Sequence, residues 1–268
     1  TELMEKNESI VAGIPLTWYK TGAGKPLVIL HGWGSRASVM QVLSDGVKNL
    51  RTSYLLDFPG FGDSPEPPEA WSVGDYARVT EAWLNDVLPE KSFDLLVHSF
   101  GGRVAIKLLS TYSIASRIDK VIFTGAAGMK PRRSFAYFVK KYVAKSLKAP
   151  FKLLPGSLEE KGLTRLRKTA LWKKLGSSDY QQLSGVMRET FVKTVTEFLE
   201  SDLSRIDHEI LLIWGKNDAA TPLYQGERMN GLLKNSALIP IEQAGHYAFL
   251  DQKIQFIAIL KSYLESGD

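Results

Sequence analysis

Short apolar runs recur along this chain, and segments with helical spacing separate them. The runs lie at residues 27–30, 54–56, 93–97, 120–124, 210–214 and 237–241. A continuous apolar run of this length is typical of a strand that is buried on both faces. Residues 14–19 alternate instead and predict a half-buried antiparallel strand. Strands that alternate with helices predict an α/β fold with a mostly parallel sheet, flanked by helices on both faces.

Helices are expected at residues 36–50 and 72–88, after residue 103, and at 249–264, where an amphipathic helix closes the chain. The chain has 268 residues, of which 44% are hydrophobic. This size and composition fit one α/β domain of the eight-stranded type with an insertion.

The insertion is expected at residues 129–202, where the alternation of strands and helices stops. Aromatic and aliphatic residues follow helical spacing there, and no convincing strand is present. We therefore expect a helical cap at 129–202 and a core formed by residues 1–128 and 203–268. Residues 130–174 hold fourteen Lys and Arg against two Glu, which gives this segment a net charge of +12. Because the whole chain has a net charge of +5, the net charge of the remaining residues is −7. A basic block of this kind indicates a solvated face or an electrostatic docking patch.

Composition also excludes several kinds of chemistry. The chain has no cysteine, so disulfides, thiolate catalysis and cysteine-ligated metals are ruled out. Its four histidines are too scattered for a metal-site spacing, and we expect no metal and no cofactor. No run approaches the roughly 18 apolar residues that span a bilayer. Residues 1–9 are polar and do not resemble a secretory signal, so we expect a cytoplasmic protein.

One strand runs directly into a serine. The apolar run 93–97 is followed by His98-Ser99-Phe100-Gly101-Gly102, and then by a helical pattern from Arg103. A sharp strand-to-helix turn lifts a serine hydroxyl above the end of a sheet and turns the next backbone N–H groups toward a ligand. The usual motif is G-x-S-x-G, and here Val97 replaces the first glycine. We expect this substitution to strain the turn by about 1 kcal/mol or more. Taken alone, Ser99 also fits an ordinary helix N-cap.

Three further signals follow other strands. His31-Gly32-Trp33-Gly34 comes after the first buried run, and the backbone N–H groups of Trp33 and Phe100 could form a two-donor oxyanion hole. Asp218 follows the 210–214 run, and His246 follows the last strand. The chain order serine, aspartate, histidine is that of one known catalytic triad. A serine needs a histidine to take its proton, and an aspartate fixes the tautomer of that histidine. We therefore predict Ser99, Asp218 and His246 as catalytic residues.

Together these residues identify the chain as similar to the α/β-hydrolase fold superfamily over essentially its whole length. The resemblance rests on His31-Gly32-Trp33-Gly34, on residues 57–64 (Asp-Phe-Pro-Gly-Phe-Gly-Asp-Ser), on the Ser99 turn, on Asp218 and on Gly245-His246. It implies that Ser99 is the nucleophile, His246 the base, Asp218 the orienting acid, and Trp33 and Phe100 the oxyanion donors. It also implies that residues 57–64 form a structural loop beside the site, and that His31 and His98 support the pocket.

The expected activity is the hydrolysis of carboxylic esters by a serine esterase. A C–C bond hydrolase, a cofactor-free perhydrolase and a non-catalytic ligand-binding member share the same fold and remain open alternatives. The His-Gly-Trp-Gly turn and the basic cap resemble the pimeloyl carrier-protein methyl ester esterases, which implies a small-molecule ester that is anionic or carrier-bound. The basic segment is expected to attract an anionic substrate, a carrier protein or a membrane surface. We expect no nucleic-acid partner and no transmembrane segment.

The acyl pocket is expected to be apolar and covered by the cap. The candidate lining residues are Phe135, Phe138, Tyr142, Trp172 and Met187. Plain packing between cap helices explains the same residues equally well. Many large side chains under a helical cap fit a closed pocket for medium-length acyl or aromatic esters.

Overall fold

The computed structural model describes residues 3–133, 135–170 and 183–267. Its strands are β1 (Glu5–Val11), β2 (Ile14–Gly22), β3 (Lys25–Leu30), β4 (Arg51–Leu56), β5 (Phe93–His98), β6 (Ile118–Thr124), β7 (Ile210–Gly215) and β8 (Ser236–Ile241). They form one eight-stranded sheet in the order β1-β2-β4-β3-β5-β6-β7-β8. The pairs β1–β2 and β2–β4 are antiparallel, and all other neighbours are parallel. The predicted mostly parallel sheet is confirmed.

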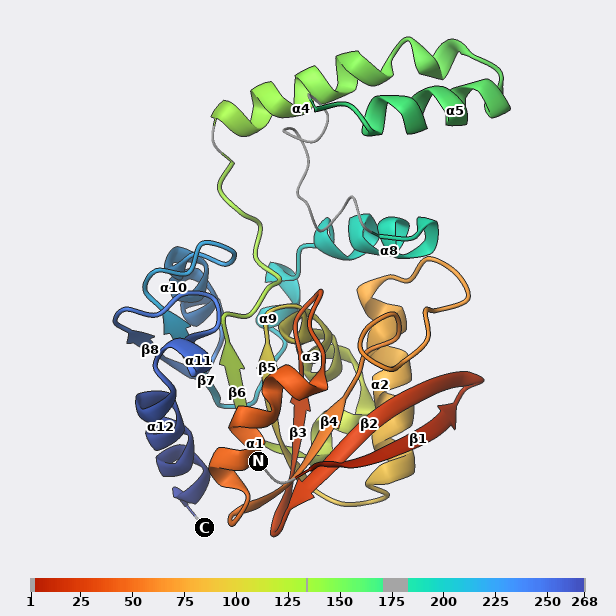
Figure 1. Ribbon diagram of the computed structural model, residues 1–268. Coiled ribbons are helices and arrows are strands. Elements are labelled where there is room, and N and C mark those ends of the chain that lie inside the picture. The colour runs from red at the N-terminus through yellow and green to blue at the C-terminus, as the bar shows by residue number, and fades with distance from the viewer. Residues whose placement is uncertain (1–2, 134, 171–182, 268) are drawn as a thin grey trace.

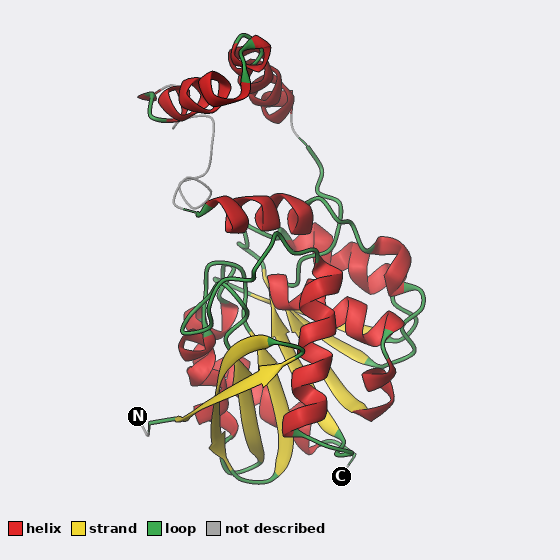
Figure 2. Cartoon of the chain, turned by 90° about the vertical axis from the view of Figure 1, so that its right-hand side faces the viewer, coloured by secondary structure: helices red, strands yellow, loops and turns green. Residues whose placement is uncertain are grey.

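Helices cover both faces of this sheet (Figures 1 and 2). The α-helices are α1 (Gln41–Val47), α2 (Val73–Val87), α3 (Phe100–Thr111), α4 (Phe135–Lys148), α5 (Gly156–Arg167), α8 (Gly185–Val195), α9 (Glu200–Leu203), α10 (Leu223–Leu232), α11 (Ala248–Asp251) and α12 (Lys253–Glu265). Three short 3₁₀ helices, η1 (Ala37–Met40), η2 (Ser113–Arg117) and η3 (Phe151–Leu153), complete the described elements.

The alternation of side chains along each strand divides the core into two layers. In β3, Val28 and Leu30 join the cluster that packs against α2, α3 and α10, whereas Leu27 and Ile29 join the cluster beneath α1, α11 and α12. Both kinds of position are fully buried. This two-sided burial is why the strands read as continuous apolar runs in the sequence.

Three details of the prediction change. The polar N-terminal segment contributes β1, which pairs with β2 through a two-residue turn at Ala12-Gly13, where both residues have positive φ. The helix expected at 36–50 is η1 followed by α1, and the closing helix is α11 followed by α12. The helix after Ser99 begins at Phe100 rather than at Arg103.

Between β6 and β7 the described elements are helical. Helix α8 lies over the end of the sheet, and the α4–α5 pair lies beyond α8, on the side away from the sheet (Figures 1 and 2). Within the ranges that the structure describes, no helix is both long enough and apolar enough to cross a membrane.

Candidate active site

Ser99 occupies a strained turn between β5 and α3. Its φ is 50° and its ψ is −112°, a region that residues with a side chain rarely adopt. Such strain costs about 1–3 kcal/mol and persists where the surroundings enforce it, often at functional sites. Gly101 allows the turn, because a Cβ there would lie 2.6 Å from the carbonyl oxygen of Leu30. The geometry is therefore that of a serine presented at a strand end, not of an N-cap, and no cap hydrogen bond from the Ser99 side chain is present.

Val97 does not strain this turn as expected. It lies in β5 in register with Phe123 of β6, and it is fully buried in the core. A β-branched residue suits an extended, buried strand. The unusual backbone conformation falls on Ser99 instead, two residues later, so the missing glycine is accommodated as core packing.

Two backbone hydrogen bonds fasten Ser99 to the end of β6. The Ser99 N–H donates to the Thr124 carbonyl at 3.2 Å, and the Ala127 N–H donates to the Ser99 carbonyl at 2.9 Å. Gly125, between these contacts, faces the other two predicted residues. A Cβ at Gly125 would lie 3.2 Å from Asp218 Oδ2 and 3.3 Å from His246 Nδ1. Ser99, Asp218 and His246 therefore gather around the carboxyl ends of β5, β6 and β7.

Asp218 and His246 are joined directly. The His246 Nδ1–H donates to Asp218 Oδ2 at 2.9 Å, and the Asp218 side chain is fully buried. The other oxygen, Oδ1, accepts from the N–H groups of Ala220 and Thr221, each at 2.9 Å. Burial pushes the pKa of Asp218 upward, but the hydrogen bond and charge of His246 and the Thr221 contacts outweigh it, so the pKa lies below its usual value. Asp218 is thus held as a carboxylate that fixes the His246 tautomer.

Thr221 also belongs to this group. Its hydroxyl lies 2.9 Å from the Gly125 carbonyl, 3.0 Å from Asp218 Oδ2 and 3.3 Å from His246 Nδ1. It therefore ties the loop after β7 to the end of β6. The sequence shows Thr221 only as a turn residue before Pro222, and nothing in its spacing signals this contact.

His98 contacts His246 through a hydrogen bond and through ring packing. Its Nε2–H donates to the His246 carbonyl at 2.9 Å, and the two ring centroids are 4.6 Å apart. Burial, followed by the nearby charge of His246, lowers the pKa of His98 to about 3. His98 is therefore neutral near pH 7 and acts as a fixed hydrogen-bond donor.

The loop that carries Trp33 is anchored by His31 and Asp57. His31 accepts from the Phe58 N–H at Nε2 (3.0 Å), and its Nδ1–H donates to the Gly32 carbonyl (2.7 Å). Burial lowers the pKa of His31 to about 4, which keeps it neutral. Asp57 accepts from the Ala37 N–H at 2.7 Å. Gly32 itself approaches the turn so closely that a Cβ would lie 3.0 Å from Ser99 Cβ.

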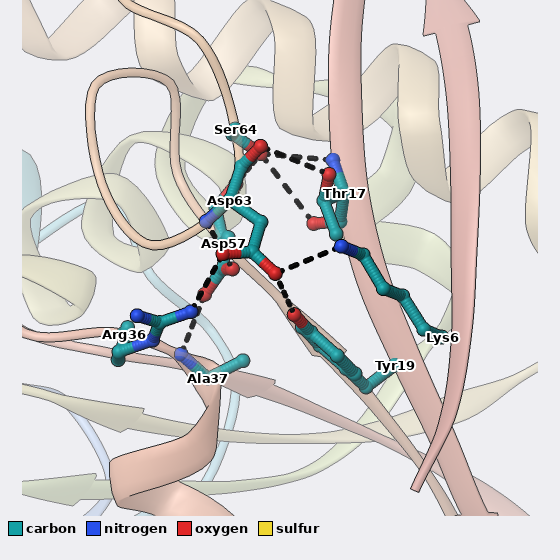
Figure 3. Close-up of polar contacts among 8 residues, drawn as sticks. All are labelled: Lys6, Thr17, Tyr19, Arg36, Ala37, Asp57, Asp63 and Ser64. Carbon is teal, nitrogen blue, oxygen red and sulfur yellow. Dashed lines mark hydrogen bonds and ion pairs between the residues drawn. The ribbon is translucent and has the colours of Figure 1, made fainter.

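A polar network continues from this loop to the edge of the sheet (Figure 3). The Asp63 carboxylate binds Lys6 of β1 at 2.9 Å, Tyr19 of β2 at 2.8 Å and Arg36 at 2.8 Å. The hydrogen bonds from Lys6, Tyr19 and Arg36 hold the pKa of Asp63 well below its usual range. Asp57 Oδ2 accepts from the Asp63 N–H at 2.9 Å. Residues 57–64 thus connect the β1–β2 hairpin to the Trp33 loop and hold that loop in position.

Helix α8 packs directly on the Trp33 loop and its neighbours. The rings of Trp33 and Phe191 are 5.3 Å apart, and Met187 lies against Gly60, where a Cβ would be 2.5 Å from its sulfur. Thr190 accepts from the Trp71 N–H at 3.0 Å. Phe191 was not among the expected pocket residues, because helical spacing alone does not show which face of α8 meets the core.

The expected pocket residues have different outcomes. Met187 is buried beside the 57–64 loop, as a pocket or packing residue would be. Tyr142 is 66% exposed on α4, so the prediction that it lines a pocket is not supported. Helices α4 and α5 form a hairpin that lies beyond α8 and does not pack on the sheet (Figures 1 and 2). Trp172 lies outside the described residues, and so do the side chains of Phe135 and Phe138. Among the described residues, no group of three His, Asp or Glu side chains could hold a metal ion.

Comparison with known proteins identifies the family of this fold. The family model for the alpha/beta hydrolase fold matches residues 25–253. The chain belongs to the α/β-hydrolase fold family. This α/β-hydrolase is 26% identical to a pimeloyl-[acyl-carrier protein] methyl ester esterase of Aliivibrio fischeri, over 93% of this chain and 97% of that protein. It is 25% identical to a 2-hydroxy-6-oxo-2,4-heptadienoate hydrolase of Pseudomonas putida, over 97% and 96%.

A solved structure shows the same fold. The esterase EaEST of Exiguobacterium antarcticum superposes with a TM-score of 0.72 at 23% identity, covering 97% of this chain and 99% of that one. Relatives of this α/β-hydrolase thus include both ester and C–C bond hydrolases.

Proposed function

We propose that this α/β-hydrolase cleaves carboxylic esters through an acyl-enzyme on Ser99. The observation that carries the proposal is the 2.9 Å contact between His246 Nδ1 and Asp218 Oδ2, next to a serine in a strained strand-to-helix turn. In this arrangement His246 Nε2, the ring nitrogen opposite the aspartate, is the one that can accept the serine proton.

The reaction divides into two steps. Ser99 Oγ attacks the ester carbonyl carbon while His246 takes the hydroxyl proton, and the proton then passes to the departing alkoxide. A water molecule next loses a proton to His246 and attacks the acyl carbon; the bond from that carbon to Ser99 Oγ then breaks, and His246 returns the proton to Oγ as the acid is released. The developing oxyanion would accept hydrogen bonds from the backbone N–H groups of Trp33 and Phe100. Phe100 opens α3, where the first N–H groups lack intrahelical partners, and such donors lower the barrier most where water is excluded.

Residues 129–202 are proposed to form the cap of this site. Helix α8 supports this assignment because Phe191 contacts the Trp33 ring and Met187 contacts the Gly60 turn. The A. fischeri relative favours an ester whose acyl group is carried by, or resembles that on, an acyl-carrier protein.

Cleavage of a C–C bond next to a ketone is the second candidate. It is favoured by the relative in P. putida and uses the same attack on a carbonyl, but the leaving group is a carbon that must be protonated. The two activities are separable with two substrates, a p-nitrophenyl ester and a 2-hydroxy-6-oxo-dienoate. The ester releases p-nitrophenolate, and the dienoate loses its visible or near-ultraviolet absorbance.

The decisive experiment is a panel of p-nitrophenyl esters from acetyl to dodecanoyl, together with labelling by a fluorophosphonate. We expect turnover and labelling by the natural sequence, and loss of both in Ser99→Ala. Ser204→Ala is a matched control, because this serine lies on the surface after α9, with its hydroxyl bonded to the Ser201 carbonyl. A natural sequence that neither labels nor turns over any ester would instead support a ligand-binding protein.

A further inference from the structure

The α4–α5 hairpin, here residues 140–170, is amphipathic, and several of its apolar side chains are exposed among the residues that the structure describes. None of its side chains is buried. Leu153 is 88% exposed, Leu158 51% and Leu154 41%, and all three lie at or next to the connection between α4 and α5. In a globular protein, helices normally bury such a face against another element. An exposed apolar group of this kind marks an interaction surface.

The same hairpin carries an uncompensated positive charge. Residues 140–170 contain nine Lys and Arg but only two acids, Glu159 and Glu160. At most a few of these cations can therefore pair within the segment. Burial lowers the pKa of Lys148, and the positive charges of Arg167 and Lys152 lower it further, so cations are crowded where the two helices meet. A negatively charged partner would relieve this repulsion.

Apolar and basic groups also share one hollow of the hairpin. It has a volume of about 1020 Å³ and lies along α5. Its lining includes Phe151, Leu154, Leu158 and Leu166 together with Lys161 and Arg165. A surface that offers hydrocarbon contacts and cations side by side matches the chemistry of an anionic amphiphile: an acyl chain joined to a negatively charged headgroup.

We propose that the α4–α5 hairpin docks this protein peripherally on an anionic lipid surface. Leu153 and Leu154 enter the boundary between headgroups and acyl chains, and the surrounding lysines face the headgroups. Basic amphipathic helices bind membranes in this way, by apolar insertion together with attraction to anionic lipids. An acidic protein would account for the charge, but it would not require the exposed leucines at the end of the hairpin.

The position of the hairpin is consistent with docking. It lies beyond α8, at the end of the molecule where the loops after β5 and β6 carry Ser99 and Gly125 (Figure 1). A lipid surface bound to the hairpin would therefore face the end of the sheet at which the parallel strands terminate. No part of the α/β core has to open for this contact.

Vesicle flotation tests the proposal. The chain of residues 1–268 with Ser99→Ala is mixed with phosphatidylcholine vesicles that contain or lack phosphatidylglycerol. The substitution prevents hydrolysis of the lipid, so binding is read independently of activity. We expect flotation with the anionic vesicles and at least tenfold weaker binding to phosphatidylcholine alone. Leu153→Ser with Leu154→Ser, and separately Lys148→Glu with Lys152→Glu, should each reduce binding to the anionic vesicles at least fivefold.

Matched controls lie on α12, far along the chain from the hairpin. Ile254→Ser changes another apolar side chain, 89% exposed, and Lys261→Glu changes an exposed lysine; both should bind as the parent does. Thermal melts followed by circular dichroism show that each variant is folded. Binding that is unchanged in the leucine variant but lost in the lysine variant would overturn the proposed insertion, because electrostatic adsorption alone would explain it, and absence of binding to anionic vesicles would overturn the proposal altogether. A dimer in light scattering that dissociates in the leucine variant would overturn it in favour of a second copy.

Discussion

The loops at the strand ends and the α4–α5 hairpin follow opposite rules. At the strand ends, the groups around His246 are bonded within the protein: both oxygens of Asp218 are satisfied, and the His98 ring donates to the His246 carbonyl. On the hairpin, leucines face solvent and cations crowd one another. Internal hydrogen bonds fix the first region, as the proposed chemistry requires, because catalysis by fixed dipoles needs no reorganisation. The second exposes apolar side chains and holds like charges close together, and a partner outside the hairpin would relieve both unfavourable features.

The largest effect on activity is expected from a substitution that removes the charge of Asp218 but keeps the size of its side chain. Asp218→Asn keeps the size of the side chain but removes the carboxylate that holds the His246 tautomer. Loss of the corresponding aspartate function in a serine triad reduces kcat by about 10⁴, and we expect a decrease of this order in ester hydrolysis. Asp207→Asn is the matched control, because Asp207 is an exposed carboxylate paired with Lys234. An Asp218→Asn variant that retains a tenth of the activity would exclude the triad.

Stability should separate the α/β core that carries the strand-end loops from the hairpin as clearly as activity does. Asp94 is fully buried and accepts from Arg51 Nε at 2.9 Å and from Lys25 Nζ at 3.0 Å. Asp94→Ala leaves the buried Arg51 without this partner, and breaking a buried pair from one side costs about 3–5 kcal/mol. Glu159→Ala on α5 should change the free energy of unfolding by less than about 0.5 kcal/mol. Urea unfolding measures both, and equal losses would contradict the contrast.

The sequence predicts the first region far better than the second, for a physical reason. Strands buried on both faces must be continuously apolar, so β3 to β7 are visible in the sequence, and the loops after parallel strands must lie at one edge of the sheet. Ser99, Asp218 and His246 follow β5, β7 and β8, so they were expected at that edge. β1 is missed because an edge strand with one solvated face is mostly polar. Contacts between separate loops, such as those of Thr221, leave no local pattern. Tyr142 follows helical spacing, but spacing does not reveal which helix face has a partner.

Buried neutral histidines should make the stability of the α/β core decrease in acid, and the described part of the hairpin contains no histidine. The pKa values of His31 and His98 are lowered to about 4 and about 3 in the folded protein, while an unfolded histidine titrates near 6.5. As the pH falls below about 6.5, the unfolded chain binds protons that the folded protein does not, so stability decreases. Each histidine contributes a slope of the order of 1 kcal/mol per pH unit down to about pH 4.

Urea unfolding at intervals between pH 7 and pH 4 measures this slope. His31→Gln should reduce it by about half, even if the variant is less stable at every pH, because glutamine does not titrate. His208→Gln is the control, because this ring contacts the Ala115 and Ile118 carbonyls at the amino-terminal end of β6. A slope that is unchanged in His31→Gln would show that other groups set the acid sensitivity of the fold.

The smallest effect is expected on the hairpin itself, and it completes the comparison. Leu158 on α5 is as apolar as the core leucines but half exposed, whereas Leu96 of β5 is fully buried. Leu96→Ala removes packed methyl groups from the sheet and should cost about 2–5 kcal/mol. Leu158→Ala removes little buried area and should change the free energy of unfolding by less than about 0.5 kcal/mol in the absence of lipid. Urea unfolding of the two variants under one set of conditions measures this difference. If Leu158→Ala destabilised the isolated protein by as much as Leu96→Ala, the hairpin would have to bury its leucines against the protein itself.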